Sequence, residues 1–485
     1  MTVTLVEGGW VVGFDGSGHE LLLDGMVAYE DDRIAYVGHD YAGPVDRRLD
    51  ARGRLIAPGF INTHIHARSN APHALFLDRT KTDYFGQNFL SYAASLPSTS
   101  GAYASEVGID GKYGMWAALR GGATTVLDVG TWPRDADGFA EMVGELGVRA
   151  YVGPGYRSSA YVFDGRGRIH QDVDEAEGMR GLAQAVSFLE RWDGAYDGRV
   201  RGMLNPGQLD TCSDALLTAT TAAARDHRAI IQLHAAMNLV EFHSVLREHG
   251  ETPIEHLDRI GFLGPEVILG HCLFHAHHSW AKYPYIDDLE VLAASGTSVA
   301  HSPNKYLKLG ILLESFDEYR RRGVNIALGT DTVPEDLVLE MRLASLGSRI
   351  AEGSFLAGSA RDVFDAATLG GARALGRDDL GRLAPGAKAD LLVIDLRQAH
   401  FGAVRDPIAS LVECGSSQDI ITIIVDGQTL VENGAAVRFD EGTFLAGVQD
   451  AGERYWSSVK HLRGATVDEI APISYPVRAS STGPA

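Results

Sequence analysis

Eight short apolar runs, separated by longer stretches with helical periodicity, are the feature that most constrains the fold of this chain. They lie at residues 55–64, 123–130, 149–156, 200–207, 229–236, 267–274, 298–303 and 325–331. Apolar runs of this length, bounded by turn signals, are typical of parallel strands that are buried on both faces. Strands that alternate with helices predict an α/β fold, and eight such repeats predict a (β/α)8 barrel.

Both ends of the chain predict a second unit made of strands. The first fifty residues alternate apolar and polar positions between turn signals, and "KADLLVIDL" and "IITIIVDGQTLVENG" do so near the other end, with an Asp-Gly hairpin signal. We expect these segments to form one small composite β-sandwich domain from residues 1–56 and 370–473. The barrel, residues 57–369, would be inserted between them, and residues 474–485 are expected to be a disordered tail.

Charge, cysteine content and hydropathy exclude several classes of protein. The chain has 43 Lys and Arg against 64 Asp and Glu, a net charge of −21, and no basic stripe, so nucleic-acid binding is disfavoured. Three widely spaced cysteines without a C-x-x-C pair argue against a disulfide framework and a thiolate zinc site. Neither a signal peptide nor an apolar run of about 18 residues is found, so we expect a cytoplasmic protein that does not bind membranes.

Metal-capable side chains recur where the predicted strands end. In "PGFINTHIHA", His64 and His66 are two residues apart on a strand, so both imidazoles point to the same side. Both lie at the carboxyl end of the first strand, the end at which barrels carry their chemistry. The later strands add four more candidates at the same rim: His234, His271, His301 and Asp331. Imidazoles and a carboxylate that converge in this way predict a metal site.

These residues lie in motifs that resemble a known family. "PGFINTHIH", "HAAMNLVEF", "GHC", "HSPNKYLKLG" and "LGTD" occur in this order, flanked by "GGATTVLDV", "AATLGGARALG" and "GRLAPGAKADLLVIDL". Together they resemble the amidohydrolase superfamily, specifically its cytosine-deaminase-like and chlorohydrolase-like branch, which includes triazine hydrolases. The resemblance covers almost the whole chain. It implies a distorted TIM barrel inserted in a composite β domain.

The resemblance also implies a ligand set. His64, His66, His234 and Asp331 would bind one divalent metal ion per subunit. Binuclear members of the family carry a lysine on strand 4, whereas strand 4 here reads "GMLNPG", so we predict a mononuclear site. Three imidazoles and one carboxylate suit Zn²⁺ or Fe²⁺ and do not separate the two metals.

The catalytic roles follow from this ligand set. A bound divalent ion lowers the pKa of its water to about 7, which provides a hydroxide nucleophile at neutral pH. Asp331 would accept the proton of that water, and His271 would stabilise charge on the heteroatom of the attacked carbon. No organic cofactor is needed.

Met237 departs from the family pattern. Deaminases of this branch resemble "HAAE" where this chain has "HAAM", and their glutamate passes a proton to a ring nitrogen. A methionine can neither donate nor accept that proton, so it argues against ordinary deamination. The alternative is that another residue supplies the proton, such as His275 or His277 of the loop "CLFHAHHSW".

The sequences of two loops differ from the family pattern at positions that are expected to contact the substrate. The strand-4 loop reads "PGQLDTCS" where the family resembles "HAPYTCS". The strand-7 loop reads "SPNKYLKLG" where the family resembles "NPxSNxKLG", so Lys305 and Tyr306 replace a small and an amide residue. We predict that the substrate contacts include Met237, His301, Asn304, Gln208 and His275.

The sequence thus predicts a metal-dependent amidohydrolase that cleaves a non-peptide C–N bond in a small amide-, urea-, carbamate- or amidine-like substrate. The first alternative is a hydrolytic deaminase or dechlorinase of a nucleobase-like or triazine ring. The second alternative is a protein that binds a metal and a ligand without catalysis. Since members of the family often form homo-oligomers, the resemblance implies a homo-oligomer as well.

Overall fold

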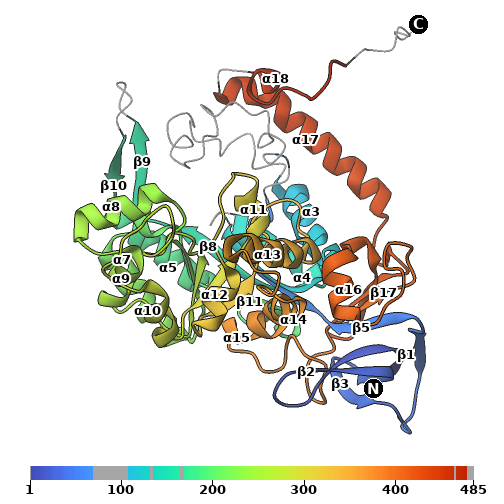
Figure 1. The fold of residues 1–485 in the computed structure, drawn as a ribbon. Helices are drawn as coiled ribbons and strands as arrows, with labels where there is room; N and C mark the ends of the chain where they lie inside the picture. The colour runs from blue at the N-terminus through green and yellow to red at the C-terminus, as the bar shows by residue number, and fades with distance from the viewer. Residues whose placement is uncertain are drawn as a thin grey trace, which may run out of the picture.

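The computed structural model describes residues 2–68, 71, 107–131, 135–163, 169–463 and 466–477 (Figure 1). Of the predicted tail, residues 478–485 lie outside these ranges. Among the described residues, no helix combines the length and the apolar character needed to cross a bilayer.

Two parallel sheets form the centre of the molecule. The first contains β6 (Phe60–Ile65), β7 (Ala123–Thr131), β8 (Arg149–Tyr156), β11 (Val200–Gly202) and β12 (Asn205–Pro206). The second contains β13 (Ile231–Ala235), β14 (Val267–His271), β15 (Ser298–His301) and β16 (Asn325–Leu328). Isolated parallel bridges join Leu204 to Ile231 and Ile65 to Asp331, so the two sheets meet at both of their edges. Each of the eight apolar runs contributes a strand to these sheets.

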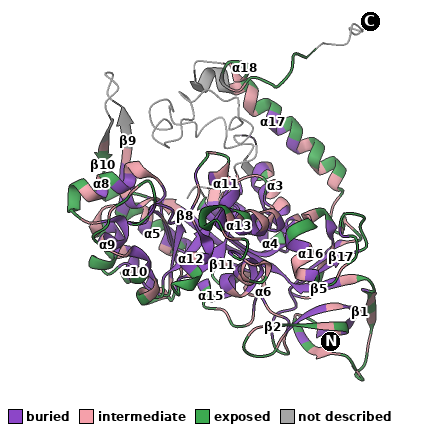
Figure 2. Cartoon of the chain, in the orientation of Figure 1, coloured by how far each residue is buried: buried purple, intermediate pink, exposed green. Residues whose placement is uncertain are grey.

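Helices cover the parallel strands, which are therefore buried (purple in Figure 2). These helices are α3 (Val107–Arg120), α4 (Ala136–Leu146), α5 (Glu175–Trp192), α6 (Ala195–Gly198), η3 (Leu209–Thr211), α7 (Asp214–His227), α8 (Leu239–His249), α9 (Pro253–Arg259), α10 (Asp288–Ser295), α11 (Pro303–Leu307), α12 (Phe316–Arg321) and α13 (Leu337–Glu352). Several begin at a side chain that accepts a hydrogen bond from the first turn, the usual N-cap: Ser213, Asn238, Thr252, Asp287, Ser315 and Asp336. A separate antiparallel pair, β9 (Ser159–Phe163) and β10 (Ile169–Val173), projects beside α8 in Figure 1.

A nine-stranded sheet joins the two ends of the chain. Its order is β20-β19-β18-β17-β5-β1-β2-β3, and β4 pairs with β1. The early strands are β1 (Val3–Phe14), β2 (His19–Glu30), β3 (Arg33–Gly38), β4 (Arg47–Asp50) and β5 (Arg54–Pro58), and the late ones are β17 (Leu391–Asp395), β18 (Ile420–Val425), β19 (Gln428–Glu432) and β20 (Ala435–Ala436). The two groups meet where β5 pairs antiparallel with β17. The expected association of both chain ends is therefore present in this sheet.

The C-terminal region holds more helix than the sequence predicted. After α13 come α14 (Ala360–Asp365), the π-helical turn η4 (Ala366–Gly370) and α15 (Gly371–Ala374), followed later by α16 (Pro407–Cys414), η5 (Ser417–Asp419), α17 (Glu441–Arg463) and α18 (Val467–Ile470). The two predicted strand segments, "KADLLVIDL" and "IITIIVDGQTLVENG", contain β17 and the antiparallel pair β18–β19, whereas the helices before, between and after them were not predicted. Asp440 caps α17 by accepting a hydrogen bond from the Thr443 amide, and the Trp116 indole donates to Glu441 at 2.7 Å, so α17 packs on α3.

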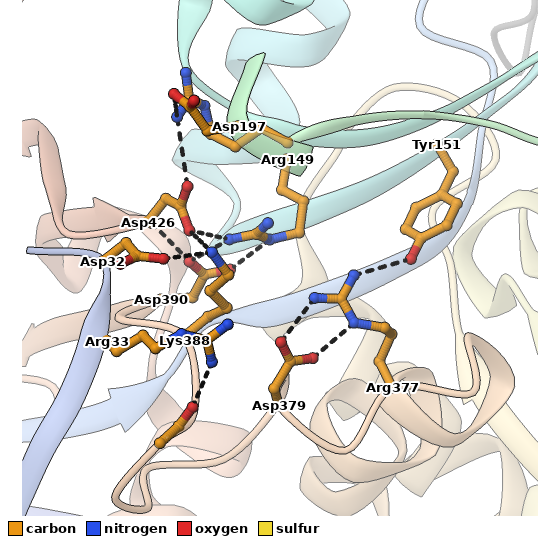
Figure 3. Close-up of polar contacts among 12 residues, drawn as sticks. Asp32, Arg33, Arg149, Tyr151, Asp197, Arg377, Asp379, Lys388, Asp390 and Asp426 are labelled. Atoms are coloured by element: carbon orange, nitrogen blue, oxygen red, sulfur yellow. Dashed lines mark hydrogen bonds and ion pairs between the residues drawn. The ribbon is translucent and has the colours of Figure 1, made fainter. Parts of the chain in front are cut away.

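Buried ion pairs connect the nine-stranded sheet with the parallel strands (Figure 3). Arg149, the first residue of β8, donates two hydrogen bonds to Asp390 at 3.0 and 3.1 Å and one to Asp426 at 2.9 Å. Lys388 and Arg199 also contact Asp426, at 2.8 and 3.4 Å. We call these five residues the buried ion network. It connects the residue before β17 and the residue after β18 with the start of β8.

Candidate metal centre

Five of the predicted site residues lie together at the carboxyl ends of the parallel strands. His64 and His234 are on β6 and β13, His66 follows β6, His271 ends β14 and Asp331 follows β16. The ligand atoms of His64, His66 and His234 lie within 4.8 Å of one another, and so do those of His64, His271 and Asp331. Since His64 belongs to both groups, the five side chains form one cluster, which we call the metal centre.

The tautomers of His66 and His234 favour a cation between them. Nδ1 of His66 donates to the Val129 carbonyl at 3.0 Å, and Nδ1 of His234 donates to the Gly207 carbonyl at 2.7 Å. With Nδ1 as the donor, Nε2 of each ring is the atom available to a cation, and the two Nε2 atoms face each other at 3.3 Å. Burial and the neighbouring imidazoles lower the pKa of His234 to about 3, so this ring stays neutral. Two nitrogens about 2.1 Å from a tetrahedral ion would be about 3.4 Å apart, which fits the observed distance.

His64 occupies the centre of the cluster in a closely packed position. Its Nε2 atom is buried and makes no hydrogen bond to any residue that the structure describes. Burial, followed by the neighbouring histidines, lowers the pKa of His64 well below its usual value, so the ring is neutral. A Cβ atom on Gly329 would lie 2.8 Å from the His64 Cβ and backbone nitrogen, which explains why a glycine precedes "TD". With its proton on Nδ1, which lies 3.1 Å from the side-chain amide of Gln232, the neutral ring would present the lone pair of Nε2 to a metal.

Asp331 is held from two directions. Its Oδ2 lies 3.2 Å from His271 Nε2 and 3.9 Å from His64 Nε2, whereas its Oδ1 accepts a hydrogen bond from Lys305 Nζ at 3.0 Å. Burial alone would raise the pKa of Asp331, but Lys305 and His271 hold it well below its usual value. The carboxylate is therefore ionised and presents one oxygen to the histidines.

Backbone strain accompanies three of the strand ends. Ala236, His271 and Asp331 have φ angles of 50°, 78° and 63°, in the left-handed region that non-glycine residues rarely adopt. Each such residue costs on the order of 1–3 kcal/mol and persists only where the surrounding structure holds it. The sequence carries no signal for this strain, nor for the ion pair of Lys305 with Asp331, although it singled out Lys305 as a departure from the family motif.

The predicted substrate-contact residues are distributed more widely. Met237 is buried, and the carboxyl group of Glu241 accepts a hydrogen bond from the backbone N–H of Ala236. Asn304 donates its backbone N–H to Glu340 at 2.9 Å, and Gln208 pairs its main chain with that of His234.

His301 and His275 are not among the five residues of the metal centre. Both are buried, and burial lowers the pKa of His301 to about 3 and that of His275 to about 4. The ring of His275 packs against Tyr319, with centroids 5.6 Å apart. In the described part of the chain, neither histidine belongs to a group of three possible metal ligands.

Comparison with known proteins identifies the family. The model of the amidohydrolase family matches residues 55–430. A 5'-deoxyadenosine deaminase of Methanothermobacter thermautotrophicus is 32% identical over 416 residues, which cover 84% of this chain and 90% of the relative. A 5-methylthioadenosine/S-adenosylhomocysteine deaminase of Symbiobacterium thermophilum is 30% identical, and the match covers 93% of this chain and 98% of the relative.

Solved structures agree on the fold. A zinc-bound adenosine deaminase from Xanthomonas campestris has a TM-score of 0.78 at 22% identity and covers 93% of this chain and 98% of its own. The atrazine chlorohydrolase of Arthrobacter aurescens TC1, complexed with zinc, has a TM-score of 0.79 at 24% identity. The match covers 93% of this chain and 100% of the chlorohydrolase chain. The chain belongs to the amidohydrolase family, as its motifs predicted. It is a hydrolase that acts on carbon–nitrogen bonds other than peptide bonds.

Proposed function

We propose that this chain is a metal-dependent deaminase that removes the amino group from the purine ring of a small nucleoside-like substrate. The observation that carries the proposal is the similarity to 5'-deoxyadenosine deaminase along nearly the whole of both chains. This is the first alternative from the sequence. The comparisons support it better than the amide-, urea- or carbamate-like substrate that Met237 had favoured.

We also propose that the two parallel sheets close into a single (β/α)8 barrel. The bridges at Leu204–Ile231 and Ile65–Asp331 support closure, because each connects one edge of the first sheet with one edge of the second. In this proposal the barrel spans residues 57–369, and residues 1–56 and 370–473 form the composite domain around the nine-stranded sheet.

The donor set of the metal centre fits one divalent ion, Zn²⁺ or Fe²⁺. His64, His66, His234 and Asp331 would hold it, since three imidazoles and one carboxylate match the preferences of both metals. When bound, such an ion would supply a nucleophilic hydroxide at neutral pH by lowering the pKa of water to about 7.

The remaining chemistry would be done by side chains of the chain itself. The carboxylate of Asp331 would accept the proton of the attacking water and pass it to the departing amino nitrogen. Lys305, on Oδ1, keeps Asp331 ionised and oriented for this transfer. Burial lowers the pKa of His271, so its neutral ring would orient the water or the substrate by hydrogen bonding rather than by charge.

The test is a product assay on protein loaded with zinc or iron, with a chelated control. Adenosine, 5'-deoxyadenosine and 5-methylthioadenosine are offered alongside aminotriazines, a chlorotriazine, a substituted urea and a lactam, and ammonia, chloride and amine release are measured. We expect metal-dependent ammonia release from at least one purine nucleoside. Cleavage of the urea or lactam without deamination of any purine would refute the proposal.

A further inference from the structure

The side chain three residues after the metal-site residue His234 of β13 cannot donate a proton. Met237 is 2% exposed, and its thioether sulfur is a weak acceptor that cannot donate a hydrogen bond. Glu241, one turn further on, accepts a hydrogen bond from the Ala236 amide through Oε1, and burial raises the pKa of its carboxyl group. When water adds to a ring carbon, electron density moves to the adjacent ring nitrogen, which then needs a hydrogen-bond donor. Besides the Glu241 carboxyl group, a buried hydroxyl beside His271 can provide it.

Tyr306 is placed to do so. It lies on α11, which follows β15, and its ring packs edge-to-face on the imidazole of His271 with centroids 4.8 Å apart. The side chain is 2% exposed, and its hydroxyl is buried without a hydrogen-bond partner among the described residues. A buried hydroxyl is normally paired, so an unpaired one beside a reaction centre indicates a group that is free to bind a substrate.

The surroundings of Tyr306 keep its hydroxyl protonated. Burial, followed by the nearby carboxyl groups of Asp331 and Glu241, raises the pKa of Tyr306 well above its usual value. Asp331 follows β16, and Glu241 lies in the first turn of α8 after β13, so these two carboxyl groups come from elements on either side of β14, which carries His271. The phenol therefore acts as a donor at neutral pH.

Two other donors near the metal centre already have acceptors. Lys305 Nζ contacts Asp331, and the hydroxyl of Tyr319, the nearby buried tyrosine, donates to the Cys272 carbonyl at 2.6 Å. We propose that Tyr306 is a catalytic residue whose hydroxyl donates a hydrogen bond to the ring nitrogen next to the carbon that loses its amino group. This assignment rests on the proposed deaminase function.

The first experiment compares Tyr306→Phe with the matched control Tyr319→Phe in the zinc-loaded enzyme. Each variant removes one buried hydroxyl, but only Tyr319 loses a hydrogen bond, so Tyr319→Phe should lower Tm with little effect on kcat. Tyr306→Phe should keep its Tm and metal content and lose about 100-fold in kcat, with a smaller change in KM. A Tyr306→Phe variant with the kcat of the wild type would overturn the assignment.

The second experiment measures binding without turnover. Purine riboside and its 1-deaza analogue, which lacks the ring nitrogen in question, are used as competitive ligands and their Kd values are determined by calorimetry. The wild type should prefer purine riboside about tenfold, and Tyr306→Phe should bind both alike. An equal preference in the two proteins contradicts the proposal. If the wild type releases no ammonia from any purine, the deaminase function itself is wrong and the role of Tyr306 falls with it.

Discussion

The metal centre and the buried ion network both contain charged or titratable side chains in the interior, but the two regions differ in how many of these side chains have hydrogen-bond partners. In the network, Asp390 and Asp426 each accept at least two hydrogen bonds, and the donors are mainly arginine and lysine. In the metal centre, Nε2 atoms of two imidazoles face each other, and His64 Nε2 has no hydrogen-bond partner among the described residues. In the network the carboxylates are paired, and only Arg149 Nη1 and Arg199 Nε lack a partner in the described part of the chain. This pairing serves stability, whereas the atoms without a partner in the metal centre can bind a metal.

The two regions also occupy opposite ends of the parallel strands. Arg149 is the first residue of β8, whereas His271 is the last residue of β14. In barrels of parallel strands, conserved chemistry belongs to the carboxyl end and structural contacts to the amino end. We therefore expect substitutions in the two regions to separate activity from stability.

The largest expected effect is on activity, from Asp331→Asn. Asparagine tolerates the positive φ of 63° at this position, so the backbone should be retained. Without a carboxylate to accept and return the proton, kcat should fall on the order of 10³-fold, while Tm stays close to that of the wild type. Steady-state kinetics and thermal unfolding measure the two quantities, and metal-dependent turnover that survives unchanged would contradict the mechanism.

The next effect is on stability, from Arg149→Met. Removing the cation leaves Asp390 and Asp426 buried with fewer partners, so the free energy of unfolding should fall by about 3–5 kcal/mol. Activity per folded molecule should be unchanged. The control is Arg48→Met, which breaks a surface ion pair with Glu7 at 2.9 Å and should cost no more than about 1 kcal/mol. Equal losses in both variants, measured by denaturant unfolding, would show that the buried ion network has no special role.

A smaller effect is expected from Gly329→Ala. The added methyl group would press on the backbone and Cβ of His64 and shift its imidazole, so the affinity for zinc should fall about 10–100-fold. A chelator competition assay measures this change. Gly138→Ala is the matched control, because a Cβ there meets nothing within 4 Å. Unchanged zinc affinity in Gly329→Ala would argue against His64 as a ligand.

The sequence predicted the parts of this structure that depend on periodicity and on fixed motifs. Buried parallel strands have short apolar runs, and these located every parallel strand in the two sheets, as well as the strand ends that carry His64, His234 and Asp331. The sequence did not predict contacts between distant residues. No local sequence pattern indicates that Lys305 pairs with Asp331 or that Tyr306 packs on His271. The helix α17 was not predicted, because the expectation for this part of the composite domain rested only on the two strand segments at residues 388–396 and 420–434.

The pairing of β5 with β17 has a consequence for how the chain is made. β5 ends at Pro58, and the strand that completes its ladder begins about 330 residues later, at Leu391. At translation rates of about 5–20 residues per second, the edge of β5 has to wait roughly 15–70 s on the ribosome for its partner. An open strand edge recruits other chains, so nascent protein in this interval depends on chaperones to cover it. Fragments that stop before residue 391 should therefore accumulate in aggregates.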